Sequence, residues 1–167
     1  KLWFYGAARR QGNELHAFGV GLRPDGQPAR PSLKQTFLTG KLSYQMTPSQ
    51  RFVGFFQQLE KYEVNEVNEY TAWEARGAPH NTPRFAKGEW EGVRGNNLIA
   101  SALFGYRLYR SIDPFNSPGQ IGRSDIFTQK VWGESFSAGD TRNEVRWEYK
   151  GALTWYKPNW AYGNHEF

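Results

Sequence analysis

The residue types that bind metal ions are present in this chain but are scattered. Its three histidines lie far apart, and none has a second ligand at the spacing of a zinc site. They are His16, His80 and His165. The acidic residues Asp113, Asp125 and Asp140 share one predicted loop, but they are spaced unlike a calcium loop, which collects its oxygen ligands within about twelve residues. The sequence therefore predicts no metal site and no cofactor.

Catalytic patterns are incomplete as well. A nucleophile elbow needs Gly-x-Ser-x-Gly, and the segments around Ser124 and Ser135 both lack the second glycine. Glu89, Glu91 and Glu148 can share one face of a sheet, as the paired acids of a glycosidase do, but acidic residues are common on any wet strand face. No glycine-rich phosphate loop joins a strand to a helix. These patterns predict that the chain is not an enzyme.

The best candidates for ligand contact combine aromatic and charged groups in predicted loops, where a rigid scaffold commonly presents its binding residues. They form two groups in the sequence. One loop carries Trp73, Glu74 and Arg76, and a second carries Arg123, Asp125, Lys130 and Trp132. The alternative is that these side chains pack against neighbouring loops or remain solvated.

Composition suits strands that have one apolar face. Aromatic residues make up 17% of the 167 residues, yet the hydrophobic fraction is only 38%. The absence of cysteine excludes disulfides and thiolate metal sites. The net charge of +5 is spread among 16 acidic residues without long basic runs, so nucleic acid is not an expected partner.

The sequence predicts neither a membrane helix nor a signal peptide. No run of about 18 apolar residues occurs, and the opening Lys1-Leu2-Trp3-Phe4-Tyr5 has neither an initiator methionine nor the layout of a signal peptide. We expect the chain to be a segment of a longer or processed protein.

Alternation of apolar and polar residues predicts an all-β fold with about seven strands. Thus Leu42 and Tyr44 fall on one face while Lys41 and Ser43 fall on the other. The third strand, which starts at Arg51, does not alternate cleanly and its faces stay unassigned. The strand windows are 1–10, 34–47, 51–63, 84–93, 97–110, 144–157 and 160–167.

Long and short connections alternate along the chain. The long ones are 11–33, 64–83 and 111–143, and the short ones are 47–50, 94–96 and the pair Pro158-Asn159. Strands that run up and down through a bilayer show this parity, because short turns join them on the periplasmic side and long loops on the extracellular side. Aromatic residues near predicted strand ends fit the girdles of such barrels. They are Trp3, Phe4, Tyr5, Tyr106, Tyr109, Trp155, Tyr156 and Trp160.

Several segments, taken in their order and spacing, resemble the barrel of TonB-dependent receptors, in particular the carboxypeptidase-regulatory-like, Oar-like group. They are the opening 1–6, the hairpin from Gly40 to Phe52, the run Pro118-Gly119-Gln120-Ile121-Gly122-Arg123, and the ending from Asn159 to Phe167. The resemblance covers most of residues 1–167. It implies part of a transmembrane β-barrel, without the plug domain and without most of the roughly twenty-two strands of such transporters.

The resemblance also implies a function and a location. Such receptors sit in the bacterial outer membrane and import a scarce ligand, such as a siderophore, cobalamin or oligosaccharide, with energy delivered by the TonB complex. The expected partners are outer-membrane lipid, the ligand, and the TonB complex through parts absent from this chain. The alternative is a soluble β-sandwich that binds carbohydrate through exposed aromatic residues such as Trp73 and Trp132.

Overall fold

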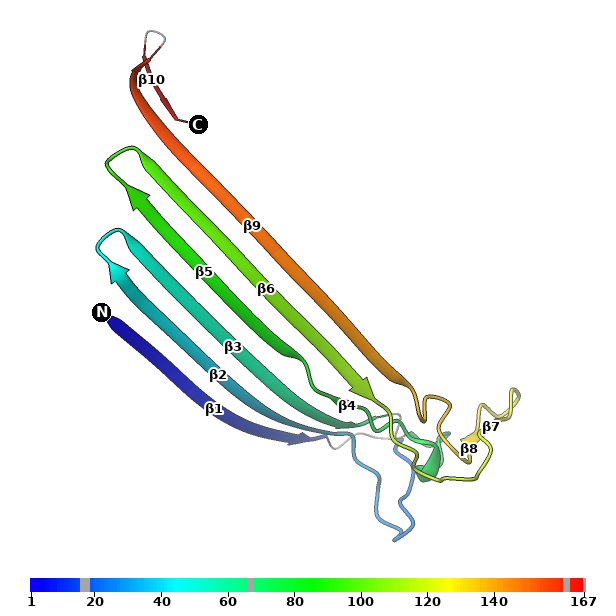
Figure 1. The fold of residues 1–167 in the computed structure, drawn as a ribbon. Coiled ribbons are helices and arrows are strands. Elements are labelled where there is room, and N and C mark those ends of the chain that lie inside the picture. The colour runs from blue at the N-terminus through cyan, green and yellow to red at the C-terminus, as the bar shows by residue number, and fades with distance from the viewer. Residues whose placement is uncertain (16–18, 66–67, 161–162, 167) are drawn as a thin grey trace.

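A single antiparallel sheet dominates the computed structural model, which describes residues 1–15, 19–65, 68–160 and 163–166. Its long strands follow one another across the sheet in chain order (Figure 1). They are β1 (Leu2–Glu14), β2 (Ser32–Thr47), β3 (Gln50–Val64), β5 (Arg84–Arg94), β6 (Leu98–Ile112) and β9 (Thr141–Trp160), with the shorter β10 (Gly163–Glu166) after them. The predicted all-β, antiparallel fold is confirmed.

Tight turns set this up-and-down order. β2 and β3 are joined by Pro48 and Ser49, and β5 and β6 are joined across a turn in which Gly95 has a φ of +63°. A left-handed backbone of this kind favours glycine, because a Cβ would be strained there. With turns this short, β3 can only pair with β2, and β6 with β5. Both of these predicted turns are confirmed.

Several strand boundaries differ from the predicted ones, and two of the differences change a predicted connection. β1 continues to Glu14, so the first long loop is shorter than 11–33. The turn predicted at Pro158-Asn159 is wrong, since both residues lie within β9. β9 pairs with β6 only as far as Trp155, and on its other side the register with β10 shifts near Pro158. No ladder hydrogen bond is therefore required from the proline nitrogen, which is why a strand tolerates it there.

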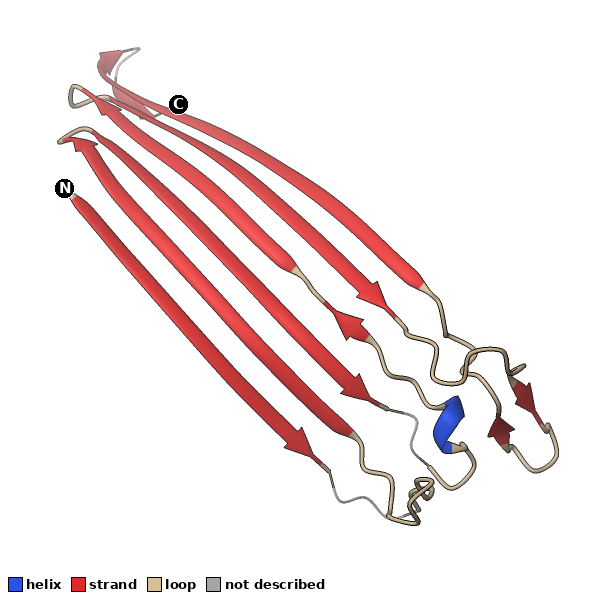
Figure 2. Cartoon of the chain, turned by 60° about the horizontal axis from the view of Figure 1, so that its bottom comes forward, coloured by secondary structure: helices blue, strands red, loops and turns tan. Residues whose placement is uncertain are grey.

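The long loops gather at one end of the sheet and the tight turns lie at the other (Figure 2). The loops contain short elements that the sequence did not reveal. These are η1 (Trp73–Ala75), β4 (His80–Asn81), and a small hairpin of β7 (Arg123–Ser124) and β8 (Val131–Trp132). β4 fills the place between β3 and β6 beyond the start of β5. The predicted alternation of long loops and tight turns is confirmed from β1 to β9, and the third predicted tight turn, at Pro158-Asn159, is the one that fails.

The sheet has no core of its own. The buried apolar residues of the described chain are Ala29 and Ala75, and both lie outside the long strands. No second long sheet packs on the first within the described residues, as a β-sandwich would require. The same residues include no helix with the length and apolar character of a membrane span. Both faces of the sheet are therefore open to their surroundings.

Candidate functional site

The pairing of the strands assigns every position to one of two faces, because paired residues in an antiparallel ladder share a face. Leu42 pairs with Phe4 on one side and with Gly54 on the other, so these three residues lie on the same face. Lys41 and Phe55 pair on the opposite face. The third strand is thereby resolved: Phe52, Gly54 and Phe56 lie on the face of Leu42, and the odd-numbered residues of β3 lie on the face of Lys41.

The face of Leu42 carries a continuous apolar band. Its members are every second residue of 2–8, 38–44, 52–56, 86–90, 98–108 and 145–155. None of these described members is Asp, Glu, Lys, Arg, Asn or Gln. The side chains are left open to the surroundings, with Phe4 85% exposed and Tyr149 72% exposed. An apolar surface of this extent normally marks contact with a protein or a membrane.

Polar residues end the apolar band toward the long loops. On the same face, the next positions are Arg10 of β1, Gln58 of β3, Arg84 of β5 and Arg110 of β6. Within β6 the band runs from Leu98 to Leu108. At about 3.3 Å per residue, that stretch extends about 33 Å along the strand.

The expected aromatic girdle is only partly on this face. Phe4, Tyr106 and Trp155 belong to the apolar band, whereas the other predicted residues with described side chains lie on the opposite face. Those misplaced residues are Trp3, Tyr5, Tyr109 and Tyr156. Tyr109 uses its hydroxyl to donate a hydrogen bond to Asn81 Oδ1, 3.0 Å away. The side chain of Trp160 is outside the described residues.

Aromatic side chains instead cluster in the middle of the apolar band. The Trp147 ring lies 5.5 Å from the Phe104 ring and 4.5 Å from the Tyr106 ring, and Phe104 also meets Tyr149 edge-on at 5.4 Å. Pairs at these distances stabilise neighbouring strands. Cross-strand pairing of β6 with β9 produced this cluster, and no local pattern in either strand predicted it.

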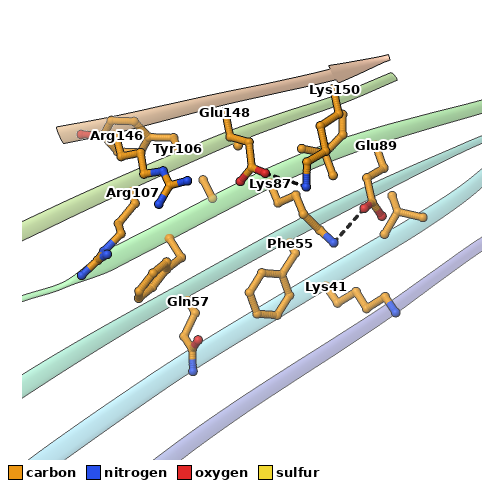
Figure 3. Close-up of a pocket in the computed structure, with 15 residues that line it drawn as sticks. Lys41, Phe55, Gln57, Lys87, Glu89, Tyr106, Arg107, Arg146, Glu148 and Lys150 are labelled. Atoms are coloured by element: carbon orange, nitrogen blue, oxygen red, sulfur yellow. Dashed lines mark ion pairs between the residues drawn. The ribbon is translucent and has the colours of Figure 1, made fainter. Parts of the chain in front are cut away.

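The opposite face contains a groove of about 700 Å³ that spans β2 to β9, and we call it the polar groove because charged side chains stand among the apolar ones that line it (Figure 3). Five of its lining residues are basic and two are acidic. They are Lys41, Lys87, Arg107, Arg146 and Lys150, with Glu89 and Glu148. Lys87 Nζ lies 2.8 Å from Glu89 Oε1, and Lys150 Nζ lies 2.7 Å from Glu148 Oε1. Both carboxylates are thus neutralised, and the groove keeps a positive excess.

These ion pairs change the interpretation of the acidic residues. Glu89 and Glu148 share a face, as the sequence suggested, but each is held by a lysine two residues away on its own strand. Glu91 does not line the polar groove. An acid and a base poised around a glycosidic bond need contrasting environments, whereas these two carboxylates have similar ones.

Of the first predicted loop group, Trp73 and Arg76 meet in the structure. The Arg76 guanidinium lies 3.9 Å from the centre of the Trp73 ring and donates to the Trp73 carbonyl oxygen at 2.6 Å. Arg23, from a different loop, lies 5.5 Å from the same ring and was not predicted. Burial and the charge of Arg23 lower the pKa of Arg76, against the opposing effect of Glu74. The guanidinium nevertheless stays charged, because an arginine side chain does not lose its proton in proteins.

The second predicted group forms the β7–β8 hairpin. Arg123 pairs with Trp132 across it, and the Asp125 amide donates to the Lys130 carbonyl oxygen at 2.8 Å. Asp125 Oδ1 also accepts hydrogen bonds from the amides of Phe127 and Thr128, which lower the pKa of Asp125. Asp125 therefore shapes the turn. The two groups are linked through the backbone, since the Ala72 amide donates to the Val131 carbonyl oxygen at 2.8 Å.

Glu134 is a buried loop anchor that the sequence did not single out. Its carboxylate accepts hydrogen bonds from the amides of Asn116 (2.9 Å), Ser117 (2.7 Å) and Ser135 (3.0 Å). Desolvation opposes ionisation, but these three bonds outweigh it and lower the pKa of Glu134. Asn116 Nδ2 in turn donates to the Arg76 carbonyl oxygen at 2.7 Å. The 111–143 loop is thereby fastened to the loop that carries Trp73.

The described residues contain no cluster of three or more His, Asp or Glu side chains that could hold a metal ion. His80 stacks on Tyr62 with 4.0 Å between ring centres. His16 and the side chain of His165 are outside the described residues.

Comparison with family models, curated protein sequences and solved structures gives no significant match. The site offers an apolar band without charged members, an opposite face with excess positive charge, and an interlinked group of loops at one end of the sheet. Such an arrangement can contact an apolar medium, hold an anion, and present loop residues to a ligand.

Proposed function

We propose that this sheet is part of the wall of an outer-membrane β-barrel that serves as a receptor and transporter. The apolar band is the observation that carries the proposal. A single-layer sheet with an exposed apolar band of this extent would be poorly stable in water, because nothing in the described chain removes the band from solvent. Lipid hydrocarbon would cover it.

The opposite face and the loops complete this proposal. A barrel wall turns its charged face toward an aqueous interior, which suits the ion-paired side chains of the polar groove. The interlinked loops would lie outside the cell, with Trp73, Arg76 and the β7–β8 hairpin near the ligand entrance. The resemblance to TonB-dependent receptors supports uptake of a scarce ligand powered through the TonB complex.

Strand edges place a further demand on a sheet in lipid. Backbone groups along the open edge of β1 would have no partners in hydrocarbon, so further strands must pair with them. In the proposed barrel those strands close the wall.

Flotation with lipid vesicles tests the proposal. The chain, refolded from denaturant in the presence of vesicles, is expected to float with them through a density gradient after washing with high salt and alkali. Peripheral association through basic residues would not survive that wash, because it depends on charge. A chain that refolds without lipid or detergent and stays in the aqueous fraction would overturn the proposal and favour the soluble carbohydrate-binding alternative.

A further inference from the structure

Two arginines of the polar groove lie directly opposite each other. Arg107 of β6 and Arg146 of β9 are cross-strand partners on the same face. Neither forms an ion pair with a carboxylate within the described residues, and both are exposed. Like charges in this relation destabilise a sheet unless something compensates them. The pair therefore offers a place for an external anion.

The nearby acidic residues compensate this pair only in part, through the interaction of Glu148 with the charge of Arg146. Glu148, two residues from Arg146, forms its ion pair with Lys150, and Glu89 forms one with Lys87. No other acidic residue lines the polar groove. Its positive excess thus rests on the two arginines and on Lys41, which lies on the same face (Figure 3). Guanidinium groups suit carboxylate or phosphate oxygens, because they offer several donors in a plane.

Aromatic rings lie next to these charges. The Arg107 guanidinium is 5.7 Å from the centre of the Phe85 ring. Phe55 pairs with Lys41 on one side and with Lys87 on the other, so an apolar ring lies between two cations (Figure 3). A bound molecule can therefore place an apolar part on the rings while its charged end reaches the arginines.

We propose that the polar groove binds a small organic oxyanion that carries a planar apolar part, with its carboxylate or phosphate between Arg107 and Arg146. The inference rests on the proposed function in one respect, namely that this face borders water and not lipid. It adds the chemical class of the solute and the residues that select it.

Phenyl phosphate is a suitable probe. The chain is refolded in micelles of an uncharged detergent at low salt, and binding is followed by ³¹P and ¹H line broadening of the probe. Saturable binding is expected, with inorganic phosphate weaker and phenyltrimethylammonium not bound. The double variant R107Q/R146Q is expected to weaken the binding of phenyl phosphate by about tenfold or more, because charge-assisted hydrogen bonds are lost.

The control R110Q/R142Q also removes one positive charge from β6 and one from β9, but outside the polar groove. It should keep the wild-type affinity for phenyl phosphate. Circular dichroism verifies that both double variants retain the sheet. Equal weakening by the two double variants, or equal binding of the cationic probe, would overturn the proposed site. The outcome is separable from the flotation result. If the chain floats with vesicles but does not bind phenyl phosphate, only the anion site is contradicted. If it binds phenyl phosphate but stays in the aqueous fraction, only the membrane role is contradicted.

Discussion

Replacing Leu42 with arginine is expected to lower the free energy of unfolding in lipid vesicles by about 2–4 kcal/mol. Leu42 lies in the apolar band between Phe4 and Gly54 and is half exposed on that face. In the proposed orientation this position is deep in hydrocarbon, where a guanidinium loses its hydration. Equilibrium unfolding in guanidinium chloride, with the chain folded into vesicles, measures the difference.

Thr39→Arg is the matched control. Thr39 is on the same strand but on the opposite face, where it pairs with Ala7 and Gln57. We expect a cost within about 0.5 kcal/mol, as for an ordinary surface substitution. Ser43 suits this purpose less well, because its Oγ accepts a hydrogen bond from Arg51 Nε at 3.2 Å. Equal costs for Leu42→Arg and Thr39→Arg would mean that the two faces meet the same medium.

Gly133→Ala is expected to disrupt the 111–143 loop. Gly133 has a φ of +81°, and a Cβ placed there would overlap the carbonyl oxygen of Ile121. The backbone conformation alone costs a non-glycine residue about 1–3 kcal/mol, and the overlap adds to it. Since Glu134 follows directly, its three amide contacts should loosen as well. Hydrogen exchange of the loop, followed by mass spectrometry, should show faster exchange at Asn116, Ser117 and Ser135.

Gly119→Ala separates the two causes. Gly119 lies in the same loop with a φ of +89°, but a Cβ there would meet nothing within 4 Å. Gly119→Ala should therefore carry only the conformational cost, and the amide hydrogens of the loop should exchange more slowly than in Gly133→Ala. If the two variants exchange alike, the close approach of Gly133 to Ile121 is not what holds the loop.

Much of the sheet was predictable because its signals are local. Alternation located the strands, and the Thr47-Pro48-Ser49-Gln50 segment located a turn. The last part of β1 was not predicted, since Gln11 to Glu14 contains no large apolar residue and shows no period of two. The turn at Pro158-Asn159 was predicted wrongly, because this residue pair is typical of turns. Its place in β9 is explained only by the ends of the pairing of β9 with β6 and β10.

The sites depended more on contacts between distant segments. Trp73 and Arg76 are close in sequence, so their association could be anticipated. Arg23 and Glu134 act through partners in other parts of the chain, and no spacing rule links them. The opposition of Arg107 and Arg146 likewise requires the register of β6 with β9. Even the faces of β3 became clear only through its neighbours, because Val53 and Phe55 place apolar residues on the polar face.

The orientation of the sheet in a membrane can be measured on a single strand, because the chain contains no cysteine. Single cysteines introduced one at a time along β6, from Leu98 to Leu108, would be labelled with a nitroxide after folding into vesicles. We predict that collision with oxygen peaks at the even positions, including Ala102 and Phe104, and that collision with a water-soluble nickel complex peaks at the odd positions, including Ser101 and Leu103. Nickel access at the even positions equal to that at the odd ones would contradict a lipid-facing apolar band.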